Sequence, residues 1–174
     1  MAIALRPATA KDLGFAFALA LNGARHGHYD LRVSTDKAGF RNYFSTAIGR
    51  GTDPWGNPTQ VLIAHADQDR VGSLVITRAI GAPDGGIELA MISVKTERQA
   101  LGYGTLMLDT LLDRYLPVMS VYARCLPASE KLRGMLERRG FDAVGRIENS
   151  IVLRHGAIGK PHLGAAVLSA ARLA

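Results

Sequence analysis

The sequence has few of the features that would place it outside the ordinary globular class. Cys125 is its only cysteine, so an internal disulfide is excluded and a cysteine-based metal site is not expected. No run of about 18 uncharged apolar residues occurs, and residues 1–6 contain no long apolar segment. We therefore expect a cytoplasmic protein with no membrane partner and no bound metal.

Aromatic residues make up only 6% of the chain, but 48% hydrophobic and 21% charged residues are ordinary proportions for a protein with one buried core. No internal repeat or linker divides the 174 residues. We predict one domain over residues 1–155. The tail over residues 156–174 ends in an alanine- and leucine-rich run that favours a helix.

The net charge of +6 comes mostly from arginine, which can bind phosphate in bidentate fashion. The basic residues are dispersed along the chain, and no RNA-binding signature is present. This pattern favours a solvated surface, although an acidic partner such as nucleic acid remains an alternative.

A glycine-containing segment at residues 99–105, Gln-Ala-Leu-Gly-Tyr-Gly-Thr, joins an apolar run at residues 87–94 to an amphipathic run that stops at Pro117. The first run predicts a buried strand and the second a helix. Gly102 and Gly104 allow close approach of a ligand to the backbone, and the first turn of a helix offers unpaired N–H groups. The segment is predicted to bind an anion such as a phosphate.

Two common phosphate loops do not fit this segment. A P-loop would need a lysine after Gly104, and a dinucleotide loop would need a third glycine where Met107 stands. A simple glycine turn that packs a helix onto a sheet is the structural alternative. The order Gln99, Gly102, Gly104 resembles the pyrophosphate loop of the GCN5-related N-acetyltransferases, the GNAT family.

The resemblance extends beyond the glycines. Glu88 stands six residues before Val94, where histone-type members of the family carry a catalytic glutamate. Arg-Gly-Phe at residues 139–141 is similar to the sequence that closes the last main helix of the family. The resemblance covers residues 3–153 loosely and 87–141 well, and it implies an α/β (α+β) fold with a mixed, mostly antiparallel central sheet flanked by helices.

The resemblance implies an N-acetyltransferase domain over residues 1–155 that uses acetyl-CoA as acetyl donor. A primary amine would attack the thioester directly, with Glu88 as general base. The predicted strand would hold pantetheine and the loop would hold pyrophosphate through backbone groups, one of which would stabilise the oxyanion. The implied cofactor-binding residues are Ile92, Ser93, Val94, Gln99, Ala100, Leu101, Gly102, Tyr103, Gly104 and Thr105.

Strand alternation makes its own prediction about Glu88. In a regular strand, Glu88, Ala90, Ile92 and Val94 point to one face. The carboxylate would then have apolar neighbours that disfavour its charged form, as suits a general base. A glutamate that faces solvent at a strand end is the alternative reading.

Two positions depart from the pattern of the family. Leu136 stands where many members carry a tyrosine general acid, so no acid can be assigned there. Ser129 stands where many members carry an asparagine that contacts the cofactor.

Several residues before the hairpin have suggestive chemistry. His26 and His28 are spaced to share one side of an extended segment and bind a metal, but the pattern favours a polar loop. By analogy with the family, His26, His28, Tyr29 and Asp30 are candidates for the acceptor wall. Trp55, on a breaker-rich loop, would either cap a substrate or pin that loop to the core.

Periodicity predicts the remaining elements. They are a strand at 3–5, a helix at 10–21 that breaks at Asn22-Gly23, a helix from residue 35 or 36, a hairpin at 61–66 and 71–78, a strand at 118–126, a helix at 128–139 and a final strand pair within 142–154.

The acceptor is open at this stage: a small amine, a protein amine and an aminoacyl-tRNA all qualify, and the family resemblance is compatible with a homodimer. The alternative to an enzyme is a non-catalytic acyl-CoA-binding or nucleic-acid-interacting module with the same fold. Its candidate nucleic-acid contacts are Arg124, Lys131, Arg133, Arg138 and Arg139.

Overall fold

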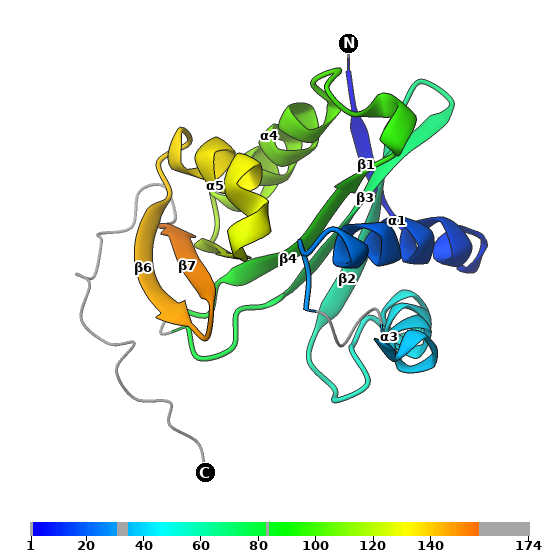
Figure 1. Ribbon diagram of the computed structural model, residues 1–174, viewed down its shortest axis with the longest axis horizontal. Coiled ribbons are helices and arrows are strands. Elements are labelled where there is room, and N and C mark those ends of the chain that lie inside the picture. The colour runs from blue at the N-terminus through cyan, green and yellow to red at the C-terminus, as the bar shows by residue number, and fades with distance from the viewer. Residues whose placement is uncertain (1, 31–34, 83, 157–174) are drawn as a thin grey trace.

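A computed structural model describes residues 2–30, 35–82 and 84–156 and contains one seven-stranded sheet (Figure 1). The strand order is β1-β2-β3-β4-β5-β7-β6, and every neighbouring pair is antiparallel except β4 and β5. The strands are β1 (Ala4–Pro7), β2 (Thr59–Ala66), β3 (Asp69–Arg78), β4 (Ile87–Val94), β5 (Val121–Cys125), β6 (Asp142–Ile147) and β7 (Ser150–His155).

Helices cover both faces of this sheet (Figure 1). They are α1 (Leu13–Arg25), α3 (Lys37–Arg50), α4 (Tyr103–Tyr115) and α5 (Glu130–Glu137). Helices α4 and α5 pack on one face, which we call the α4 face, and α1 and α3 pack on the other, which we call the α3 face. The predicted fold class, a mixed and mostly antiparallel sheet flanked by helices, is confirmed.

Strand alternation divides the core between the two faces. On β2, Leu62 and Ala64 point to the α4 face, whereas Val61 and Ile63 point to the α3 face. All four side chains are buried. The central strands are therefore apolar on both faces, which explains why they appear in the sequence as nearly continuous hydrophobic runs.

Most predicted element ends differ from the structure by one or two residues, and two differ by more. Helix α1 continues through Asn22 and Gly23 to Arg25, because Gly23 serves packing there: a Cβ at this position would overlap the ring of Tyr29. The strand predicted from residue 118 begins only at Val121, because the chain first makes a turn in which two N–H groups donate to the carbonyl of Tyr115.

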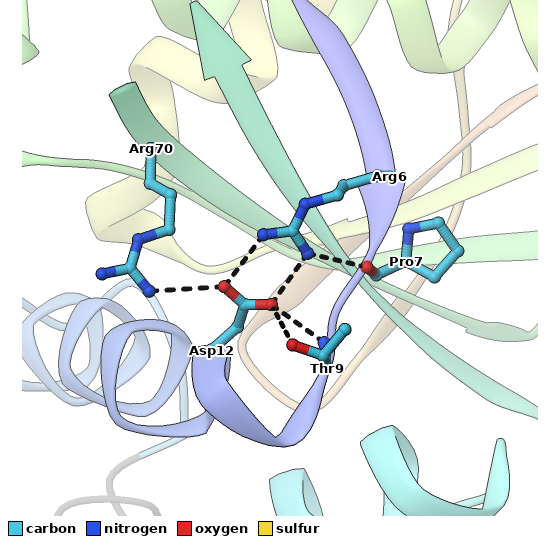
Figure 2. A network of polar contacts seen from close by, with 5 residues as sticks. All are labelled: Arg6, Pro7, Thr9, Asp12 and Arg70. Carbon is cyan, nitrogen blue, oxygen red and sulfur yellow. Dashed lines mark hydrogen bonds and ion pairs between the residues drawn. The ribbon is translucent and has the colours of Figure 1, made fainter. Parts of the chain in front are cut away.

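A buried carboxylate fixes the start of α1 against the sheet (Figure 2). Asp12 is 2% exposed and accepts hydrogen bonds from both terminal nitrogens of Arg6 and from the Thr9 N–H, at 2.8 to 3.0 Å. Arg70 of β3 adds a third cationic contact at 3.3 Å. The hydrogen bonds from Arg6 hold the pKa of Asp12 well below its usual range, so a charged group links β1, β3 and α1. The Thr9 hydroxyl also donates to Asp12, at 2.9 Å.

The predicted tail lies outside the described residues from residue 157 onward. None of the helices in the described ranges combines the length and the apolar character needed to cross a bilayer.

Candidate active site

The centre of the sheet opens between β4 and β5. Their parallel pairing covers only Ile87–Leu89 on β4, and β4 then continues to Val94 without a strand on that side. The N–H of Lys95 donates to β3, so alternation directs the backbone groups of Ile92 and Val94 to the open edge. Such an edge can pair with an extended ligand in the manner of an added strand.

The predicted pantetheine residues take different positions at this edge. The Ile92 carbonyl accepts from the Tyr29 hydroxyl at 2.8 Å, and the Val94 carbonyl accepts from the Gln99 side-chain amide at 3.2 Å. Because the backbone of Ser93 faces β3, this residue offers its hydroxyl, which lies 2.7 Å from the Tyr29 hydroxyl. The N–H groups of Ile92 and Val94 are thus the donors directed to the opening.

The predicted pyrophosphate loop leads into α4. Ala100 and Gly102 have φ angles of 60° and 82°, which turn the chain so that Gly102 caps the helix. The first helical bond runs from the Leu106 N–H to the Gly102 carbonyl, so the N–H groups of residues 103–105 precede it. A row of backbone donors at the positive end of a helix suits an anion, and this geometry fits the predicted cradle.

The loop presents backbone more than side chains. A Cβ at Gly102 would meet nothing within 4 Å, so the positive φ alone favours glycine there. Tyr103 is 8% exposed and packs in the core of the α4 face, whereas Leu101 points outward and is 55% exposed. The Tyr103 ring therefore anchors the loop in the core of the α4 face.

The structure overturns the predicted alternation along β4. The register with β3 shifts so that Leu89 and Met91 pair with consecutive residues, which leaves Ala90 as a β-bulge. Glu88 and Ala90 consequently lie on the α3 face, whereas Ile92 and Val94 pack on the α4 face. The sequence predicted one shared face for Glu88, Ile92 and Val94, and this prediction is wrong.

Glu88 has a charged neighbour in place of the predicted Ile92 and Val94. Its Oε1 atom accepts a hydrogen bond from Arg124 Nε at 2.6 Å. The Glu88 side chain is 13% exposed and that of Arg124 is 50% exposed. Parallel pairing sets Glu88 opposite Tyr122, so Arg124, two residues further along β5, reaches it on the same face. The sequence gives no signal for this contact, which joins strands 36 residues apart.

A phenol completes this region of the α3 face. Burial raises the pKa of Tyr43 to about 12; a hydrogen bond with Thr59 opposes this shift, and the carboxylates of Asp53 and Glu88 add to it. Tyr43 therefore stays protonated at neutral pH. We call Tyr43, Glu88 and Arg124 the acceptor cluster.

The loop before β2 borders this cluster and is held by Asp53. The Asp53 carboxylate accepts hydrogen bonds from Trp55 N–H, Asn57 N–H and Asn57 Nδ2 at 2.8 to 2.9 Å. Trp55 itself is 80% exposed, so it does not pin the loop to the core. Of the two predicted roles, only the substrate cap is compatible with this exposure.

The hydrogen-bond partners of His26 and His28 lie outside the acceptor cluster. His26 Nδ1 is 2.8 Å from the Asn22 carbonyl, and His28 Nδ1 is 3.3 Å from the hydroxyl of buried Ser129. Within the described ranges, no three histidine, cysteine or acidic residues gather in a way that could hold a metal. Leu136, at the position of the absent tyrosine, is fully buried in the core.

Most of the basic residues predicted as nucleic-acid contacts already form ion pairs within the chain. Arg124 pairs with Glu88, Arg133 with Glu137, and Arg139 with Asp109 through two hydrogen bonds. Paired cations contribute less to a field that attracts phosphate backbones. The structure therefore weakens the nucleic-acid alternative.

Comparison with known proteins rests on structure alone. No protein-family model matches the sequence, and no curated protein matches it. Among solved structures, one described as histone acetyltransferase HPA2 and related acetyltransferase from Corynebacterium glutamicum is 15% identical, with a TM-score of 0.71 over 94% of this chain and 100% of its own.

Two further structures carry more specific descriptions. The PaiA N-acetyltransferase of Thermoplasma acidophilum in complex with coenzyme A is 15% identical, with a TM-score of 0.61 over 90% of this chain and 99% of its own. The ribosomal-protein-S18-alanine N-acetyltransferase of Escherichia coli is 12% identical, with a TM-score of 0.62 over 92% of this chain and 97% of its own. With its open β4 edge and its glycine loop at the start of α4, this chain has the fold of the GCN5-related N-acetyltransferases.

Proposed function

We propose that residues 1–155 form an N-acetyltransferase domain that transfers the acetyl group of acetyl-CoA to a primary amine. The observation that carries the proposal is that two features adjoin: the open edge at Ile92 and Val94 leads directly to the glycine loop and to the backbone donors of residues 103–105. An extended thioester with a pyrophosphate at one end matches that order of donors.

In this proposal the reacting carbonyl lies where β4 and β5 part, near the acceptor cluster. Glu88 takes a proton from the ammonium or from the attacking amine, directly or through a water. The amine nitrogen bonds to the carbonyl carbon, the carbon–sulfur bond breaks, and the sulfur leaves as thiolate. An N–H group at the open edge stabilises the negative charge on the carbonyl oxygen. Direct attack needs no cysteine nucleophile: Cys125 is buried, and burial raises the pKa of its thiol to about 11.

The test is thiol release from acetyl-CoA in the presence of small amines, lysine peptides, peptides with free N-termini and aminoacyl-tRNA. The Glu88→Gln variant, which keeps the side-chain volume, should lower kcat/KM by roughly 100- to 10,000-fold on the acceptor that works. Arg133→Gln, at a partly exposed position of helix α5, serves as the charge-change control. Wild-type protein that binds acetyl-CoA and releases no thiol with any amine would support the non-catalytic module instead.

A further inference from the structure

The ion pair between Glu88 and Arg124 stands at the point where β4 and β5 separate. Ala123 is the last β5 residue that pairs with β4, and Arg124 follows it directly. Arg124 uses its Nε atom to contact Glu88 and leaves its side chain half exposed. No acceptor for its two terminal nitrogens occurs in the part of the chain that the structure describes. A two-pronged donor therefore faces the proposed acceptor site.

Of the other polar groups near the pair, one is uncharged and the other is a carboxylate already hydrogen-bonded within its own loop. Tyr43 is a neutral phenol at physiological pH. The carboxylate of Asp53 already accepts three hydrogen bonds from its own loop. The acceptor cluster is thus a negative group and a positive group side by side, and its electrostatic complement is a small molecule with an amine close to an anion.

This arrangement separates the acceptor classes that the sequence leaves open. A polyamine would bring extra positive charge against Arg124, which costs binding energy. A lysine side chain or an aminoacyl ester offers an amine without a nearby carboxylate, so the terminal nitrogens of Arg124 would have no partner. A free amino acid offers both groups: its ammonium faces Glu88 and its carboxylate fits the planar fork of Arg124.

We propose that Arg124 binds a carboxylate of the acceptor, and that the acceptor is a small zwitterionic amine of the amino-acid class. The inference rests on the proposed acetyl transfer. The carboxylate takes part only in binding: the ammonium first loses one proton to water, the amine nitrogen then bonds to the acetyl carbon while the carbon–sulfur bond breaks and coenzyme A leaves as thiolate, and Glu88 takes the second proton from the nitrogen. Arg124 is then a specificity-determining residue of this reaction.

The test compares each proteinogenic amino acid with its own carboxamide as acceptor. The carboxamide keeps the amine and the side chain but has no negative charge. Wild-type protein should favour the acid of the best pair by roughly 10- to 100-fold in kcat/KM, as expected for charge-assisted hydrogen bonds. Arg124→Gln should abolish this ratio, and Arg124→Lys should keep part of it, because lysine restores the charge but not the fork.

The ratio of kcat/KM for the acid to kcat/KM for the carboxamide distinguishes substrate binding by Arg124 from a purely structural role. If Arg124 merely held Glu88 in place, its replacement would slow the acid and the carboxamide alike and leave the ratio unchanged. Arg133→Gln removes an arginine of similar exposure, 42% against 50% for Arg124, from another ion pair and should preserve the wild-type ratio of kcat/KM values. A wild-type ratio near one, or a ratio retained in Arg124→Gln, overturns the inference while the acetyl transfer itself can stand.

A binding experiment distinguishes failure of the proposed acetyl transfer from failure of the proposed carboxylate site. Isothermal titration of each acid and carboxamide into protein saturated with coenzyme A requires no catalysis. If no amine releases thiol but the acid binds at least tenfold more tightly in an Arg124-dependent manner, acetyl transfer fails and the carboxylate site stands as a binding site. Equal binding of acid and carboxamide in that protein removes the site.

Discussion

The two faces of the sheet hold their helices by different means. The α4 face is closed by aliphatic side chains such as Leu108 and Leu111, which are fully buried. The α3 face has aromatic rings, including Phe40 and Phe44, and the charged network of Asp12. The first face presents backbone donors to the proposed cofactor, and the second presents side chains to the proposed acceptor. Sites made of backbone tolerate sequence change more easily than sites made of side chains.

The first test of this contrast compares one substitution on each face and measures how its effect on the free energy of unfolding depends on pH. Asp12→Asn should lower the free energy of unfolding by about 2 kcal/mol at pH 7, because Arg6 and Arg70 lose a buried charged partner. Leu111→Ala should lower it by about 2 to 5 kcal/mol. Urea denaturation at several pH values measures both effects.

The two effects should respond differently to acid. The folded-state pKa of Asp12 lies below the unfolded value of about 3.9, so its charge stabilises the fold at higher pH, and this contribution fades as the pH falls below about 3.9. The cost of Asp12→Asn should therefore shrink at pH 3, whereas the cost of Leu111→Ala should not follow this curve. Asp113→Asn, on the exposed side of α4, provides the carboxylate control. An acid-independent cost of Asp12→Asn would contradict a charge-based attachment.

The second test addresses the backbone character of the cofactor loop. Gly102→Val introduces a branched side chain at φ 82°, which should distort the cap of α4 and raise the KM for acetyl-CoA by roughly tenfold or more. Gly81→Val is a matched control, because its φ is 75° and a Cβ there also meets nothing within 4 Å. If both variants had the same small effect on KM, the loop would not be the anion site.

The smallest effect is expected at the link between the two faces. The Tyr29 ring packs on the α3 face, while its hydroxyl bonds the Ile92 carbonyl at the open edge of β4. Tyr29→Phe should raise the KM for acetyl-CoA roughly 3- to 10-fold, because about 1 kcal/mol of edge positioning is lost. Tyr115→Phe, which loses a 3.3 Å bond to Gln60, is the control. An unchanged KM for acetyl-CoA would show that pairing with β3 alone positions the open edge of β4.

Local signals explain what the sequence could predict. The apolar runs, the Thr9–Asp12 pairing and the cap of α3 at Asp36 all depend on residues a few positions apart, so they could be read directly. The turn and helix start at residues 99–105 were also predictable, because glycine spacing and a helix start are local features, and phosphate binding there stays a prediction.

The acceptor cluster could not be predicted in the same way. Arg124 meets Glu88 only because two strands pair in parallel for three residues and then separate. Tyr43 reaches the same place from α3. The bulge at Ala90 has no local signature either, since alanine fits a regular strand as well as a bulged one. Side-chain chemistry assembled from three elements needs the tertiary structure.

The bulge at Ala90 gives β4 two phases. Before it, even-numbered Glu88 faces the proposed acceptor; after it, even-numbered Ile92 and Val94 face the α4 core. If the same residues formed a regular strand, Glu88, Ala90, Ile92 and Val94 would share one face, and aligning Ile92 and Val94 with the core would turn Glu88 towards α4. Counting along this strand therefore places the proposed base on the correct face only when the bulge is included, and deletion of Ala90 should give a regular strand that keeps Glu88 on the α3 face and Ile92 and Val94 on the α4 face.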